Sequence, residues 1–280
     1  MKHILIPTDF SENSWNALIY GLEMFKKTKC TFYLMHVIPI PTYSGAGTSL
    51  SASDGDFRAA IVKNGKQDLQ QLLARVQKEV SLSPKHTFAP LAFYDYFTEA
   101  VKREAKKNKV DMIIMGTKGA TGLKKVTVGS NTGDVITKVA HTLLAVPENA
   151  QYSEISEIAF PTDFQINYNL KILDNLIEIA TMNDAEIRIL NSTKEGKKLT
   201  TEQHKNKDFL DDYLIDINHS FHSLTGLKLE TAVQAFTESR DIDMIAMVAK
   251  NLNFFQRILF RPDVEKISYY TKVPFLILHD

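Results

Sequence analysis

The chain has 280 residues, a length that suits two domains of about 140 residues better than a single core. Its 33 basic residues balance 33 acidic residues, so no overall charge favours nucleic acid or anionic lipid as a partner. No apolar run approaches the roughly 20 residues that a membrane span requires, and the first residues do not resemble a secretory signal. We therefore expect a cytoplasmic protein without membrane or nucleic-acid partners.

The first half of the chain alternates short apolar runs with segments of helical periodicity. Strands are expected at residues 4–7, 32–38, 86–92, 112–115 and 143–146. Helices are expected after Ser11, which fits an N-cap, and at residues 61–80, 97–108 and 128–140. Apolar strands separated by helices indicate a parallel sheet covered on both faces and joined by right-handed crossovers. The segment 42–56 is long for such a connection, and the sequence leaves open whether it is a mobile loop or a lid.

Cysteine usage excludes a disulfide framework. Cys30 is the single cysteine, so no disulfide can form within the chain. It stands at the start of an apolar run, a position that favours a buried thiol packed as a small hydrophobe over a reactive one.

The second half of the chain repeats the first. Residues 4–10 (ILIPTDF) recur at 158–164 as IAFPTDF, and residues 111–115 (DMIIM) recur at 243–247 as DMIAM. The apolar pattern breaks near residues 147–156, where we place the junction between the copies. The sequence therefore predicts an α/β protein with two tandem, doubly wound, mainly parallel five-stranded sheets flanked by helices, in domains 1–148 and 149–280.

The turn after the fourth strand carries residues suited to a phosphate. Gly116, Gly119 and Gly129 let the backbone approach an anion closely. Ser130 and Thr132, at the start of a predicted helix, add hydroxyl donors to the unpaired N–H groups of that helix end. Ligands of open α/β sheets bind beyond the carboxyl ends of the strands, which is where this turn lies. Its spacing is neither a Walker P-loop nor a dinucleotide fingerprint.

These motifs resemble those of a known family. The pattern Gly-x2-Gly-x9-Gly-Ser that begins at Gly116 is similar to the ATP-binding signature of the universal stress protein family. The Pro-Thr-Asp sequence at residues 7–9 resembles the first-strand turn of that family. The resemblance covers essentially the whole chain as two tandem domains, strongly in the first copy and only through strand ends and apolar pattern in the second.

The resemblance implies an adenine-nucleotide site in the first copy, for ATP or alternatively ADP or AMP, with Mg²⁺ left open. The residues implied to hold adenine and ribose are Pro7, Thr8, Asp9, His36 and Val37. The residues implied to line the ribose and phosphate side are Met115, Gly116, Lys118, Gly119, Gly129, Ser130, Asn131 and Thr132.

Two of these residues also fit a purely structural role. His36 closes an apolar strand, where a histidine with structural hydrogen bonds is common. Asp9 also fits a cap of the following helix. The second copy keeps Asp163 at the same place beside a lost glycine segment, so a structural aspartate in both copies stays an alternative.

The second copy departs from the glycine pattern. At the positions of Gly116 and Gly119 the second copy has Val248 and Asn251. At the positions of Gly129 and Ser130 it has Arg261 and Pro262. A branched or bulky side chain prevents close approach of the backbone, and proline lacks the N–H that an anion site needs. We expect the second copy to bind no nucleotide in this way and to serve as structure or interface.

The sequence favours a stress-response or signalling module that binds an adenine nucleotide without catalysis as its main task. Weak ATP hydrolysis, another nucleotide hydrolase activity, and a scaffold without ligand are the alternatives. The sequence shows no Ser-His-Asp set at strand ends, no Cys/His metal spacing and no carboxylate pair in the candidate site, so we assign no catalytic or metal residues. Domains of the universal stress protein family commonly pair through edge strands, so the resemblance implies that the two copies pair within the chain and leaves a homodimer open. The edge candidates are residues 143–146 and 275–278, which are flat and apolar enough to invite aggregation if exposed.

Overall fold

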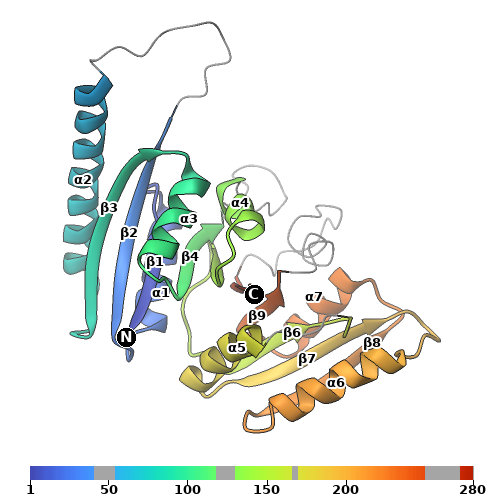
Figure 1. Ribbon diagram of the computed structural model, residues 1–280. Coiled ribbons are helices and arrows are strands. Elements are labelled where there is room, and N and C mark those ends of the chain that lie inside the picture. The colour runs from blue at the N-terminus through green and yellow to red at the C-terminus, as the bar shows by residue number, and fades with distance from the viewer. Residues whose placement is uncertain (41–53, 118–129, 166–169, 250–271, 280) are drawn as a thin grey trace, which may run out of the picture. The chain divides into compact units, whose positions relative to one another are not determined.

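The structure is a computed structural model that describes residues 1–40, 54–117, 130–165, 170–249 and 272–279 (Figure 1). They form two compact units, Met1–Gly116 and Thr117–Asp280. Most of the segment 42–56 lies outside the described residues.

The first unit is a parallel sheet with strand order β3-β2-β1-β4. Its strands and helices are β1 (Lys2–Pro7), α1 (Glu12–Met24), β2 (Cys30–Pro39), α2 (Asp54–Glu79), β3 (His86–Asp95), α3 (Phe97–Lys107) and β4 (Met112–Thr117). The chain moves outward from β1 to β3 and then returns to β4 on the other side of β1. Right-handed crossovers therefore place α1 and α2 on one face of the sheet and α3 on the other.

The second unit repeats this order as β8-β7-β6-β9 and adds two strands, β10 next to β9 and then β5. Its strands and helices are α4 (Ser130–Lys138), β5 (Leu143–Pro147), β6 (Glu157–Pro161), α5 (Leu170–Asn183), β7 (Glu186–Thr193), α6 (Thr201–Tyr213), β8 (His219–Thr225), α7 (Leu229–Ser239), β9 (Met244–Val248) and β10 (Phe275–Leu278). The predicted α/β class with a parallel sheet flanked by helices is confirmed in both units.

β10 and β5 form the antiparallel pair of the second unit. Phe275 lies opposite Ala145, and Leu276 lies opposite Leu144. Every residue of both strands is buried. This pairing places β5 in the same compact unit as the second half of the chain. The sequence repeat instead assigns it to the first copy, and the division at residues 148 and 149 stays a prediction.

The core lies in the central strands of each sheet. Ile4, Leu5 and Ile6 of β1 are at most 1% exposed. Strands that are covered on both faces consist of continuous apolar runs, and full burial of each such side chain contributes roughly 1.5–3 kcal/mol. The residues of the outer strands β3 and β8 are mostly half-buried, with some exposed, and among them only Ala92 of β3 is buried. The apolar strand runs of the sequence thus mark the central positions.

Helix starts were predicted with uneven success. Ser11 is the N-cap of α1, and its Oγ accepts a hydrogen bond from the Ser14 N–H at 3.3 Å. The second helix begins at Asp54, well before the predicted residue 61. Residues 55–60 are all exposed, so this part of the helix has no buried face that would produce an apolar periodicity in the sequence.

Among the described residues, no helix is both long and apolar enough to cross a bilayer.

Burial of Cys30 gives a first testable prediction. The thiol is 1% exposed, and burial raises its pKa to about 11. Because only the thiolate is nucleophilic, we expect the folded protein at neutral pH to react with a disulfide reagent at least about a hundredfold more slowly than the protein in denaturant. The chain has no other cysteine, so the absorbance of the released thiol reports this site alone. Rapid reaction in the native state would contradict the buried position.

Candidate functional site

The turn after β1 is built around the side chain of Thr8. Its backbone N–H donates to Met35 O on β2 at 2.8 Å, and its Oγ1 accepts the Phe10 N–H at 3.0 Å. The same oxygen lies 3.0 Å from Ser14 Oγ on α1. Phe10 takes a left-handed conformation with φ of 63°, which is strained for a residue with a side chain. The buried threonine thus fixes the direction in which the chain leaves the sheet.

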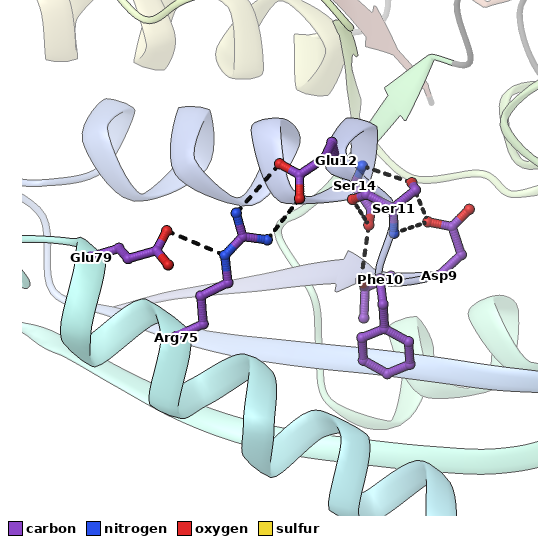
Figure 2. A network of polar contacts seen from close by, with 8 residues as sticks. Asp9, Phe10, Ser11, Glu12, Ser14, Arg75 and Glu79 are labelled. Atoms are coloured by element: carbon purple, nitrogen blue, oxygen red, sulfur yellow. Dashed lines mark hydrogen bonds and ion pairs between the residues drawn. The ribbon is translucent and has the colours of Figure 1, made fainter.

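Asp9 is exposed, and the contacts of one of its carboxylate oxygens are local (Figure 2). Oδ1 accepts hydrogen bonds from Ser11 N at 3.1 Å and from Ser11 Oγ at 2.5 Å. Partial burial raises the pKa of Asp9, but the hydrogen bonds from Ser11 outweigh it and hold the pKa below its usual value. The carboxylate is therefore ionised at neutral pH and orients the N-cap residue of α1.

His36, at the end of β2, binds the same turn. Its Nδ1 lies 2.9 Å from Thr8 O and must be the donor, because a carbonyl oxygen only accepts. The imidazole also packs on the Phe10 ring with centroids 4.5 Å apart. Val37 follows on the opposite face of the strand, since successive side chains alternate. The structural role considered for His36 is thus present.

Gly116, near the end of β4, lies against the first turn of α1. A Cβ atom at this position would lie 2.7 Å from Asn13 O and 2.8 Å from Asn13 Nδ2. Such short Cβ contacts essentially never occur in folded proteins, so packing against Asn13 is by itself enough to require glycine at this position. The sequence pattern indicated the glycine but gave no sign of Asn13, because this contact joins elements far apart in the chain.

The structure places the predicted site residues in three groups. At the carboxyl ends of β1, β2 and β4 in the first unit lie Pro7, Thr8, Asp9, His36, Val37, Met115 and Gly116. Ser130 begins α4 in the second unit, followed by exposed Asn131 and by Thr132, which is 3% exposed. Lys118, Gly119 and Gly129 lie outside the described residues.

A cluster beside this edge was missed by the sequence reasoning (Figure 2). Arg75 of α2 donates to Glu12 in the first turn of α1 at 2.9 Å and to Glu79 at 3.2 Å. Its guanidinium lies over the Trp15 ring, 3.8 Å from the centroid. The hydrogen bond from Arg75 lowers the pKa of the Glu12 carboxyl. The contacts of Arg75 with Glu12 and Trp15 join α2 to α1. These partners lie far apart in the sequence, so no local motif could indicate the contacts.

The second copy has the same turn after β6. Phe164 is left-handed with φ of 55°, and its N–H donates to Thr162 Oγ1 at 3.0 Å. Asp163 Oδ1 accepts the Gln165 N–H at 3.0 Å. Asn191 takes the place of the histidine and donates to Thr162 O at 2.8 Å. The turn is therefore a structural feature of both copies, independent of any ligand.

The rest of the second copy's site differs or lies outside the described residues. Val248 aligns with Gly116 and is 7% exposed. Asn251, Arg261 and Pro262 lie outside the described residues. Among the residues that the structure describes, no group of three His, Cys, Asp or Glu side chains is placed to hold a metal ion.

The model of the universal stress protein family matches residues 1–147, which is the copy with the glycine segment. The chain belongs to the universal stress protein family. A universal stress protein of Methanocaldococcus jannaschii is 29% identical over 140 residues, 50% of this chain and 78% of that protein. A second one from the same organism is 27% identical over 158 residues, 52% of this chain and 94% of that protein.

A solved structure extends the likeness to the second copy. The universal stress protein of Archaeoglobus fulgidus superposes with a TM-score of 0.73 at 16% identity, and the match covers 99% of this chain and 98% of that one. At this identity the likeness concerns the fold. Nearly the whole chain, including the half without the glycine pattern, therefore has the fold of a universal stress protein.

The packing of Gly116 gives a second prediction. Gly116→Ala places a methyl group against a backbone oxygen of α1, so we expect a loss of stability of about 1–3 kcal/mol. Urea denaturation followed by circular dichroism measures it. Gly55→Ala is the matched control, because a Cβ there meets nothing within 4 Å and alanine favours the helix by up to about 1 kcal/mol. Equal stability of the two variants would show that Asn13 does not restrict this position.

Proposed function

We propose that the first copy binds an adenine nucleotide, ATP foremost and ADP or AMP otherwise, and that the protein acts as a stress-response or signalling module. The proposal rests on the fact that several of the predicted site residues lie together at one edge of the sheet. The family model matches the copy in which the Pro7–Asp9 turn, the end of β2 and Gly116 meet at one edge of the sheet. This is the edge at which open α/β sheets bind their ligands.

The chemistry of this edge supports a nucleotide. In family members that bind nucleotide, the first-strand turn and the end of the second strand hold adenine and ribose. The glycine segment would take the phosphates, with Gly119 and Gly129 leaving the backbone accessible and Lys118 adding positive charge. Asp9 has an acceptor to offer a ribose hydroxyl, because its contact with Ser11 uses Oδ1.

The second copy contributes structure in this proposal. Val248 puts a branched side chain where the first copy has Gly116, and the aligned Arg261 and Pro262 remove the room and the N–H that phosphate needs. Its strand β10 forms an antiparallel pair with β5, the last strand of the first sequence copy. We propose that the two copies pair within the chain through these strands, which would otherwise expose an apolar edge.

The test of the function is direct. The purified protein is heat-denatured, and the nucleotide released is identified by mass spectrometry; the stripped protein is then titrated with ATP, ADP and AMP by calorimetry. We expect one site per chain. Uptake of none of the three would overturn the proposal.

A substitution that imitates the second copy gives a third prediction. Gly129→Arg fills the phosphate position, so we expect nucleotide affinity to fall by more than about a hundredfold, or about 2.7 kcal/mol, in a folded protein. Calorimetry measures the affinity, and circular dichroism checks the fold. Lys250→Ala and Arg261→Ala, in the aligned segment of the second copy, are the controls and should leave affinity unchanged. A folded Gly129→Arg protein with full affinity would count against the glycine segment.

The paired aspartates give a fourth prediction, which separates structure from binding. Asp9→Ala and Asp163→Ala each remove the acceptor that orients the residue two positions later. Thermal unfolding should therefore show destabilisation by both, each by roughly 0.5–2 kcal/mol, as is usual when a helix-end polar contact is lost. In calorimetry, Asp9→Ala alone should weaken nucleotide binding. Equal affinity of the two variants would mean that Asp9 is purely structural.

A further inference from the structure

The turn after β6 has a feature that is not found at the turn after β1 among the residues that the structure describes. Three successive carbonyl oxygens, those of Thr162, Asp163 and Phe164, each accept a hydrogen bond from a side-chain amide. The donors are Asn191 Nδ2 at 2.8 Å, Gln203 Nε2 at 2.7 Å and Asn206 Nδ2 at 2.8 Å. Two of the three donors come from α6, the helix that follows β7 (Figure 1).

The orientation of Gln203 is fixed by its own helix. It is the third residue of a capping box in which its N–H donates to Thr200 Oγ1 at 3.2 Å and its Oε1 accepts the Thr200 N–H at 2.9 Å. The box leaves the Nε2 group free to point outward, where it reaches Asp163 O. Asn206 lies three residues later on the same face of α6 and reaches Phe164 O.

In the described part of the first copy, one of the three equivalent carbonyls has a side-chain donor. Thr8 O accepts from His36, as Thr162 O accepts from Asn191. Among the residues that the structure describes, none donates a hydrogen bond to Asp9 O or Phe10 O. The two turns therefore share their backbone conformation but differ in what satisfies their outward carbonyls.

We propose that α6 is the built-in occupant of the second copy's turn. Its two amides, on Gln203 and Asn206, take the acceptors at the edge where an α/β sheet otherwise receives a ligand. The turn is thus closed by the chain itself and needs no small molecule to complete it. The loss of glycines in this copy removes the phosphate position, and α6 separately closes the first-strand turn. This closure does not depend on nucleotide binding by the first copy.

Hydrogen exchange of the full chain tests the closure as a fifth prediction. The double variant Gln203→Glu/Asn206→Asp keeps size and shape but has no N–H donors and turns oxygens toward the carbonyls. A Glu at the third helix position still completes a capping box and suits the helix dipole, so α6 itself is not weakened. We expect exchange about tenfold faster in peptides that contain Thr162 to Phe164, measured by mass spectrometry.

The control is Glu202→Gln/Asp208→Asn, which changes the same kinds of groups at exposed positions of α6. This control should leave exchange in the turn unchanged. Wild-type exchange in a folded Gln203→Glu/Asn206→Asp protein would overturn the proposal.

Hydrogen exchange of the wild-type protein with ATP is the second measurement, and it is informative even if the Gln203→Glu/Asn206→Asp protein fails to fold. We expect no added protection at 162–164 or 200–206, and protection there would show a ligand in the turn. Absence of protection in the first copy as well would count against the proposed function and not against the closure.

Discussion

The hydrogen bond from the phenylalanine N–H to the threonine Oγ1 in the turn after the first strand of each copy is the constraint on which the edge of the sheet depends. It holds Phe10 and Phe164 in a left-handed conformation that neither would adopt freely. That conformation turns the chain from the sheet into the next helix within a few residues. The proposed ligand contact in the first copy and the proposed closure in the second copy both involve groups of this turn.

The two copies differ around this shared turn. The first copy keeps Gly116, where the strand end approaches α1 closely, and leaves two carbonyls of its turn unused among the described residues. The second copy places Val248 at the aligned strand position and brings the amides of α6 onto its turn. Within the described residues, the same fold thus has one turn with two outward carbonyls that accept no hydrogen bond and one turn in which α6 donates to them. The contrast lies in side chains and not in the arrangement of strands.

The sequence predicted what depends on local or repeated patterns. The strand runs, the Ser11 cap and the repeated turn all lie within short segments, so their residue types indicate the local structure, whereas the role of the glycine pattern stays a prediction. The contact of Gly116 with Asn13 and the contacts of α6 with the second turn could not be predicted, because each joins elements distant in the chain. The early start of α2 was missed since its first turns are exposed and carry no apolar stripe.

The antiparallel seam between β5 and β10 has a consequence for how the gene can be divided. Both strands are wholly buried, and each covers the apolar edge of the other. A shortened protein ending near residue 148 would therefore expose Leu143–Pro147 as an unpaired apolar strand that can pair with a strand of another chain and cause aggregation. The complementary fragment would carry the same hazard along Phe275–Leu278. Co-expression of the two fragments offers each its natural cover.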